Sequence, residues 1–291
     1  MPSLITLKRR IGSIKNTRQI TKAMELVSSS KLRRAQAAAL ASRAYREAAY
    51  DLLSRLNQVK EVEQQPLFKK RPIKTRLYVV ITSNSGLAGA YNSNVLKLLA
   101  QDLKQDQSEK VKSSAITVGS KGAQFVRRVE NVELFSHYPA FGDEPTEGDI
   151  VPLLNSVIDA YREEKVDEVR LIYTEFKSSL SQVATSLSLL PAGTEEMPKE
   201  PPATAGFMNF EPDVETVIHN AGVRLIQAQI WQALLESNAS EHAMRAVAMK
   251  NATDNADDLI EDYTLEYNST RQGKITQEIA EITGGAEALT A

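Results

Sequence analysis

Residues 3–27, SLITLKRRIGSIKNTRQITKAMELV, carry the pattern that decides the fold. Their apolar side chains recur at steps of three and four residues, which places them on one face of an α-helix. Ser3 can cap the helix, and apart from Gly12 no glycine or proline follows before Pro66. A helix from Ser3 to Lys60 would be roughly 85 Å long, at a rise of about 1.5 Å per residue. No compact domain needs a helix of that length.

The other end of the chain carries a matching pattern. Pro212, the last proline, suits the first turn of a helix, and from there to Thr283 only Gly222 and Gly273 interrupt. As one helix, this segment would be on the order of 105 Å long. We expect the two terminal segments to pair as a long antiparallel coiled coil. The recurring apolar positions of the second helix include Ile260, Tyr263, Tyr267, Ile275, Ile279 and Ile282.

The charges of the two ends are opposite, although the whole chain has a net charge of only -2. Residues 1–60 hold thirteen Lys or Arg and three Asp or Glu, a net +10, and residues 207–291 hold five against fourteen, a net -9. Blocks of opposite sign make each end the natural partner of the other. The alternative for the basic helix is a nucleic-acid-binding coiled coil, but its first 44 residues contain no aromatic side chain for base stacking.

Between the ends, the sequence predicts an inserted α/β domain. Charged and proline-bearing linkers at residues 61–74 and 191–206 bound it, so we divide the chain into residues 1–60, 61–206 and 207–291. Strand and helix patterns alternate between the linkers, which favours a layered, doubly wound domain with a largely parallel sheet. The expected strands are 76–83, 115–118, 168–176 and 182–190, and the expected helices are 92–104, 121–128 and 150–164.

Composition excludes several kinds of site. The chain has no cysteine, which rules out disulfides, thiolate metal sites and cysteine nucleophiles. No stretch approaches the roughly 20 apolar residues of a membrane span, and Met1 leads into charged residues without an apolar signal core. We expect a soluble protein that stays inside the cell.

The run Gly86-Leu87-Ala88-Gly89-Ala90-Tyr91 lies where a phosphate-binding loop would lie, after an expected strand and before an expected helix. It lacks the third glycine of the dinucleotide fingerprint, and the chain contains no G-x-x-x-x-G-K-[ST] run. The pattern therefore favours a tight strand-to-helix turn, with nucleotide binding as the alternative.

Other candidate sites are weaker. His137, His219 and His242 have no metal-ligand spacing, which favours packing or solvated histidines. An acidic group in the last segment lacks the calcium-loop pattern and follows a helical rhythm, so a solvated or partner-facing helix surface is the better interpretation. It comprises Asp254, Asp257, Asp258, Glu261 and Asp262.

The segment Ile20-Thr21-Lys22-Ala23-Met24-Glu25-Leu26-Val27, continued by SSSKLRRAQ to Gln36, closely resembles the amino-terminal helix of the gamma subunit of rotary F-type ATP synthases. Three other places agree in order along nearly the whole chain: TSNSGLAGAYN (residues 82–92), AMKNATDNA (residues 248–256) and ITQE (residues 275–278) with its following small residues.

This resemblance implies a non-catalytic central-stalk rotor subunit without cofactors. It would be turned by the membrane rotor ring and would drive the catalytic subunits through their nucleotide affinities. Implied partners are the catalytic and non-catalytic head subunits, the small epsilon stalk subunit and the ring, with no nucleic acid. The absence of cysteine argues against plastid members. The implied location is peripheral, on the cytoplasmic face of a bacterial plasma membrane, or in the mitochondrial matrix for a processed protein.

The resemblance also supplies candidate contact residues. Met24 matches the position that faces the moving catalytic subunits. Phe210 and Glu211 match the foot near the membrane ring. Four polar residues match contacts of the upper shaft with the hexamer: Arg245, Gln272, Thr276 and Glu278.

The carboxy-terminal tip should project beyond the paired helices. If the linkers set the register, the second helix has roughly a dozen extra residues, which corresponds to about 15 to 20 Å. Its isoleucines and small residues then need another partner. The resemblance supplies an apolar sleeve formed by the hexamer, in which the tip would act as a bearing.

Overall fold

The computed structural model describes residues 3–56, 62, 65–142, 145–192 and 213–290, without side-chain detail for 44–47, 49–56, 214 and 287–290. The chain forms two compact units. The terminal unit contains residues 1–28 and 246–291, and the central unit contains residues 29–245. Each unit is described by itself below.

Two long helices account for the ends of the chain. Helix α1 runs from Leu4 to Leu56 and α5 from Val214 to Thr290, both without a break. The amino end of α1 is capped as expected, because the Thr6 amide donates to the Ser3 hydroxyl at 3.2 Å. Asp213 caps α5 in the same way through the Thr216 amide at 2.8 Å, and these bonds lower the pKa of its carboxyl. The two helices expected from the sequence are confirmed.

The central unit holds a five-stranded sheet in the order β3-β2-β1-β4-β5. The first four strands in this order are parallel, and β5 is antiparallel to β4. The strands are β1 (Thr75–Ile81), β2 (Lys112–Val118), β3 (Val132–Tyr138), β4 (Glu168–Ser178) and β5 (Ser181–Leu190). The helices between them are α2 (Tyr91–Glu109), α3 (Ser120–Val126) and α4 (Val151–Arg162), with a 3-10 turn at Glu147–Ile150.

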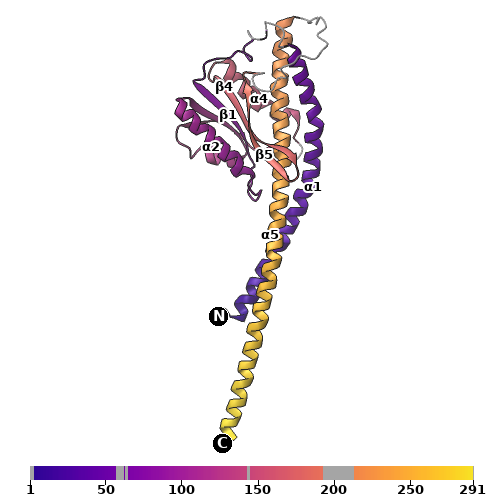
Figure 1. The fold of residues 1–291 in the computed structure, drawn as a ribbon, viewed down its shortest axis with the longest axis vertical. Helices are drawn as coiled ribbons and strands as arrows, with labels where there is room; N and C mark the ends of the chain where they lie inside the picture. The colour runs from indigo at the N-terminus through magenta and orange to yellow at the C-terminus, as the bar shows by residue number, and fades with distance from the viewer. Residues whose placement is uncertain (1–2, 57–61, 63–64, 143–144, 193–212, 291) are drawn as a thin grey trace. The chain divides into compact units, whose positions relative to one another are not determined.

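Helices cover both faces of this sheet (Figure 1). On one face, Tyr78 and Val80 of β1 pack against α2 and α3 through Val95, Leu99 and Val126. On the other face, alternate strand residues pack against α4 and the first turns of α5. Alternation of side chains along each strand sends neighbours to opposite faces, so β1 is buried on both sides. The expected doubly wound α/β architecture is confirmed.

Strand β3 was not predicted. In its sequence, VELFSHY, the pairs Leu134-Phe135 and Ser136-His137 break the alternation of apolar and polar residues, although every second residue is exposed. It is an edge strand that pairs only with β2 in the described sheet. The strand therefore lacks the strict alternation by which a half-buried strand is predicted from sequence.

Buried charges join the amino-terminal ends of β1 and β4 to α2. Arg76 forms ion pairs with Asp106 and, at 2.6 Å, with Glu168. Asp106 is fully buried and also accepts hydrogen bonds from the hydroxyls of Tyr78 at 2.7 Å and Ser113 at 2.8 Å. Burial raises the pKa of the Tyr78 hydroxyl, so it remains a donor. The network joins β1, β4 and α2 at the end of the sheet where these two strands begin.

Candidate functional site

The terminal unit consists of a pair of antiparallel helices. Arg18 of α1 forms an ion pair with Asp257 of α5, and the hydroxyls of Thr21 and Thr253 lie 2.9 Å apart. Further toward the start of α1, the Arg10 guanidinium lies 5.8 Å from the Tyr263 ring centroid. Residues nearer the start of α1 therefore contact residues nearer the end of α5, which is the order of contacts in an antiparallel pair.

Buried side chains in this unit are mostly small or slender. Ser28, Met249, Thr253 and Ala256 are all buried, whereas the Arg18–Asp257 ion pair is about half exposed. Exposed ion pairs contribute only about 0 to 1 kcal/mol each. Close packing along this seam is therefore the larger contribution to pairing, and the opposed charges help to set orientation.

The last part of α5 extends beyond its partner. The pairing register places Ser3 near residue 271 of α5, and every side chain from Arg271 to Ala286 is exposed. The helix continues to Thr290, so about 20 residues, or roughly 30 Å, extend beyond the start of α1. The overhang is longer than the sequence predicted, because α1 and α5 pair at a different register from the one that the linkers suggested.

Three of the candidate contact residues, Gln272, Thr276 and Glu278, lie on this overhang and are exposed. The Thr276 hydroxyl donates to the Gln272 carbonyl at 3.0 Å, a bond within the helix. Ile279 is 60% exposed and Ile282 is 73% exposed. A helix that presents bulky apolar side chains to solvent has the composition of a partner-binding surface.

Met24 lies half-buried on α1. Around it, Ile20, Leu26 and Val27 are more than half exposed, and basic residues such as Lys22 interleave with them. Apolar side chains flanked by positive charge suit an acidic or amphipathic protein partner.

In the central unit, α5 and α1 both hold the carboxyl end of β4. The Thr174 amide donates to the Ser237 hydroxyl at 3.3 Å, and the Ser240 hydroxyl donates to the Thr174 carbonyl at 3.4 Å. Arg43 of α1 donates to the Phe176 carbonyl at 2.9 Å. Arg43 also lies 3.6 Å from the carboxylate of Glu236, which is buried. The sheet is thus hydrogen-bonded directly to both long helices.

The turn after β1 sits at the topological switch point of the sheet, between β1 and β4. The Thr82 hydroxyl donates to the Val118 carbonyl at 2.9 Å and accepts from the Gly122 amide at 2.9 Å. A side chain at Gly119 would place its Cβ 2.1 Å from the Thr82 carbonyl oxygen. Glycine is therefore required where the turn after β2 crosses the end of β1.

Two asparagines complete this turn. The Asn84 side-chain oxygen accepts from the amides of Ser120 at 3.2 Å and Ala140 at 3.0 Å. The Asn92 side-chain oxygen accepts from the Ser83 amide at 3.0 Å. The amide of Ser83, which follows the strand, is thus satisfied within the protein, as expected for a structural turn and not for an open phosphate cradle.

Arg245 connects this turn to α5. Its guanidinium donates to the Glu241 carboxylate at 2.6 Å, to the Ser85 hydroxyl at 3.3 Å and to the Gly86 carbonyl at 3.5 Å. The residue is 9% exposed. The sequence resemblance predicted Arg245 as a partner contact. In the structure, Arg245 also bonds to the turn that follows β1 in the same chain.

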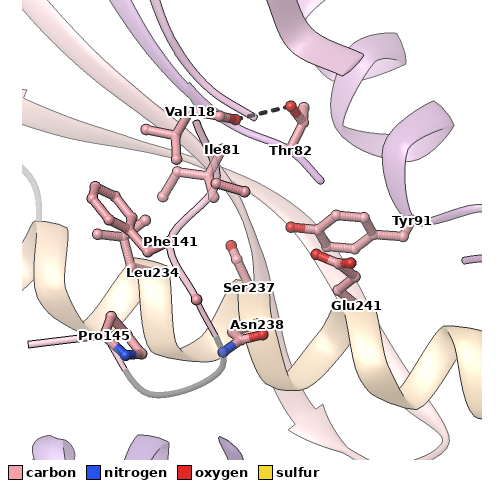
Figure 2. Close-up of a pocket in the computed structure, with 12 residues that line it drawn as sticks. Ile81, Thr82, Tyr91, Val118, Phe141, Pro145, Leu234, Ser237, Asn238 and Glu241 are labelled. Atoms are coloured by element: carbon pink, nitrogen blue, oxygen red, sulfur yellow. Dashed lines mark hydrogen bonds between the residues drawn. The ribbon is translucent and has the colours of Figure 1, made fainter. Parts of the chain in front are cut away.

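A cavity remains beneath this turn (Figure 2). It is lined by Thr82 of the turn, by Tyr91 at the start of α2, and by Ser237 and Glu241 of α5. Burial, and then the nearby Glu241 carboxylate, raise the pKa of the Tyr91 hydroxyl, which stays protonated. The volume open to water is about 30 Å³, which is the share of one water molecule. A nucleotide does not fit in it.

The remaining candidates are histidines and the residues expected at the foot. His137 Nδ1 lies 3.1 Å from the Thr117 hydroxyl, and His242 is buried in α5. Within the described part of the chain, no three His, Cys, Asp or Glu side chains are grouped to hold a metal ion. Phe210 and Glu211 lie outside the described residues. Of the helices that the structure describes, none is both long and apolar enough to cross a membrane.

Sequence reasoning missed the residues that build the switch-point turn. Thr82 and Asn84 follow β1, Gly119 follows β2, and Ser237 comes from a helix about 150 residues beyond Thr82 in the chain. Only the glycine between β2 and α3 gave a local signal, since a glycine after an expected strand marks a tight turn.

Comparison with known proteins places these features in context. A family model described as ATP synthase matches residues 3–289. The ATP synthase gamma chain of Paracidovorax citrulli (strain AAC00-1) is 38% identical over 283 residues, covering 97% of this chain and 98% of that protein. That of Moorella thermoacetica is 39% identical over 289 residues, covering 99% and 100%.

Solved structures agree with the relatives. A chain from the central stalk and c-ring of the Tetrahymena thermophila mitochondrial ATP synthase matches with a TM-score of 0.62 and 25% identity, covering 80% of this chain and 99% of that one. A chain of the Euglena gracilis mitochondrial ATP synthase in rotational state 3 matches with a TM-score of 0.69 and 20% identity, covering 98% and 94%. The second likeness shows the fold.

Proposed function

Because this chain belongs to the ATP synthase gamma-chain family, we propose that it is the central-stalk rotor subunit of an F-type ATP synthase. In this role it transmits rotation of a membrane ring to the catalytic subunits and so couples ion flow to ATP synthesis or hydrolysis. The observation that carries the proposal is the pair of long antiparallel helices that ends in an unpaired, exposed tip.

The geometry suits a shaft. A rotating element inside a collar must be long and narrow, and the seam of Ser28, Thr253 and Ala256 lets two helices approach closely. It must also be tied to the element that receives the force. The bonds from Ser237, Ser240 and Arg43 to β4 hold the sheet to the parts of α5 and α1 that belong to the central unit.

The candidate contacts divide by position. Met24 and Arg245 would transmit torque to the catalytic subunits, with Arg245 oriented by Glu241 and by the turn at Ser85. Gln272, Thr276 and Glu278 would contact the hexamer around the overhang. Phe210 and Glu211 would belong to the foot at the ring, which the epsilon subunit shares. The division into residues 1–60, 61–206 and 207–291 is part of this proposal.

The chain would be peripheral, on the cytoplasmic face of a bacterial plasma membrane or on the matrix side in a mitochondrion. The nucleic-acid alternative is not favoured, because Arg18 and Arg10 are occupied by Asp257 and Tyr263 of α5. A filter-binding assay at low salt, with a basic DNA-binding protein as the positive control, tests this.

The first prediction is that the purified chain does not hydrolyse ATP, whereas it restores rotation-coupled hydrolysis to head subunits that lack a gamma chain. No lysine lines the cavity beneath the switch-point turn, and the residues that the structure describes contain no group of side chains that could hold a metal ion there. The measurement is steady-state ATPase activity of the chain alone and after reconstitution. Stoichiometric, metal-dependent turnover by the chain alone would contradict the proposed non-catalytic role.

The second prediction concerns the overhang. Truncation after Thr270 removes the whole unpaired part of α5 but leaves the contacts at Tyr263, Asp257 and Thr253 in place. Assembly should weaken and turnover should slow, while some rotation persists, because the tip acts as a bearing. Single-molecule rotation of the reconstituted complex measures this. Complete loss of rotation in correctly assembled particles would place the essential torque contacts at the tip.

A further inference from the structure

The end of the sheet at which the parallel strands begin is rich in lysine. Lys69, Lys70 and Lys74 lie on the segment that leads into β1, and Lys110 and Lys112 lie between α2 and β2. The two groups are adjacent, because the Lys112 amide donates to the Lys74 carbonyl at 2.9 Å. All five lysines are exposed. We call these five residues the basic edge.

The basic edge has an excess of positive charge. None of its five lysines forms an ion pair with a residue that the structure describes. Nearby carboxylates are already engaged: Glu163 pairs with Lys165 at 2.6 Å, and Glu164 pairs with Arg71 at 3.5 Å.

Other acidic groups at this edge are also occupied. The Asp167 carboxylate accepts the amides of Lys74 and Thr75, each at 2.9 Å. Glu109 accepts from the Gln105 side chain at 2.8 Å. The exposed Glu130 is the exception, because it lies on the turn before β3, near the start of β2, and lines a cavity with Val111.

The ordinary role of such lysines is to complement helix dipoles, since α2 and α4 both end at this edge. That role accounts for Lys110, which caps α2. It does not account for Lys69, Lys70 and Lys74, which lie on an extended segment together with Ile73, an apolar residue that is 41% exposed.

The contacts of the sheet with α5 show at which part of that helix the basic edge lies. Phe68, just before the edge, packs against Gly222, where an added Cβ would lie 2.9 Å from the Phe68 ring. At the other end of the strands, where β1 and β2 finish, Glu241 of α5 lines a cavity. These two positions on α5 are about 28 Å apart. The basic edge therefore lies at the level of the first turns of α5, which directly follow the proposed foot at Phe210 and Glu211.

We propose that the basic edge is a docking surface for anionic phospholipid headgroups, and this rests on the proposed function, which places the foot at the membrane. Lysine is a compact, hydrated point charge that needs no fixed partner geometry, and clusters of four to eight basic residues near a membrane bind anionic lipid. Such attraction is not directional, so it holds the foot near the bilayer without stopping its rotation.

The distribution of the charges favours lipid over an acidic protein. The five lysines come from two chain segments. None of them lines the cavity beneath the turn after β1, or a second cavity of about 240 Å³ that lies beside Val111 and Glu130. A protein partner with fixed carboxylates would be matched better by arginine forks and a shaped pocket. A diffuse lysine surface with one exposed isoleucine fits a fluid, multivalent anionic surface.

The test uses the full chain and cosedimentation with vesicles of phosphatidylcholine alone or mixed with phosphatidylglycerol. The wild-type chain should bind the anionic vesicles, and the variant K69Q/K70Q/K74Q/K110Q/K112Q should lose about tenfold or more in partition coefficient. Binding should weaken in high salt. The corresponding Lys→Arg variant keeps the charge and should retain binding.

The matched control removes five other exposed or half-exposed lysines that lie away from this edge: K97Q/K121Q/K177Q/K250Q/K274Q. It changes the net charge equally and should bind like the wild type. Equal loss in both variants would show that total charge decides binding, and an unchanged basic-edge variant would show that the edge is not involved. Either result overturns the proposal.

Two further measurements separate the possible failures. If the basic-edge variant bound vesicles normally but bound a membrane ring in neutral nanodiscs less well, the edge would be a protein-docking surface and the lipid proposal would be wrong. Reconstitution with head subunits reports on the rotor function itself. A chain that failed to activate ATP hydrolysis there would overturn the proposed function, whatever the vesicles showed.

Discussion

Replacing Gly119 by alanine should destabilise the central unit by about 3 kcal/mol or more, or prevent it from folding. The added Cβ would lie 2.1 Å from the Thr82 carbonyl oxygen, and the residue has a φ of +91°, which L-residues rarely adopt. It cannot move back, since its amide donates to the Tyr138 carbonyl at 2.8 Å. Denaturant unfolding followed by circular dichroism measures the loss.

Gly142→Ala is the control for this experiment. No atom lies within 4 Å of a Cβ built at Gly142, so the change should stay within about 0.5 kcal/mol of the wild type. Equal stability of the two variants would mean that the turn at Gly119 relaxes freely. In that case this glycine would not fix the position of the turn after β2 against the end of β1.

The second large effect concerns Asp106. Asp106→Leu should cost about 3 to 5 kcal/mol of unfolding free energy, because it leaves the buried Arg76 with one partner fewer and the hydroxyls of Tyr78 and Ser113 without their acceptor. The same unfolding measurement applies. A loss below about 1 kcal/mol would show that water or rearrangement satisfies these donors.

Asp102→Leu, on the same helix, is the matched change. Asp102 is half-buried and accepts one bond, from Ser186 at 3.1 Å, so its removal should cost about 1 kcal/mol. A double variant with Arg76→Leu tests the coupling. It should be less destabilised than the sum of the two single changes, because the second change removes the buried charge that lost one of its two carboxylate partners in the first.

Much of the fold could be predicted from the sequence because its signals are local. The long helices follow from apolar steps of three and four, and the alternation of strands and helices follows from periodicity between glycine and proline breaks. For three of the four predicted strands, both the first and the last residue lie within two residues of the observed ones. The helix predicted at 150–164 corresponds to α4. The edge strand β3 was missed because Leu134-Phe135 and Ser136-His137 break the alternation of apolar and polar residues that indicates a strand.

The candidate site was less predictable because its parts are distant in sequence. The run from Gly86 to Tyr91 favoured a tight turn over a phosphate site from its sequence, but that pattern did not indicate that Glu241 and Arg245 of α5 lie beside it. No local pattern indicates which helix covers a strand end. The register of α1 and α5 was also not predictable, because small residues such as Ala35 and Ala39 fit many alignments of the two helices.

Open α/β sheets ordinarily accommodate small molecules in the crevice beyond the strand ends, at the point where the strand order reverses. Here Ser237 and Glu241 of the chain's own α5 occupy that place and leave room for about one water molecule. An inhibitor aimed at this crevice would have to displace a helix that is hydrogen-bonded to β4 at Thr174. Pharmacological screens that rely on fold resemblance to nucleotide-binding domains would therefore be misdirected for this protein.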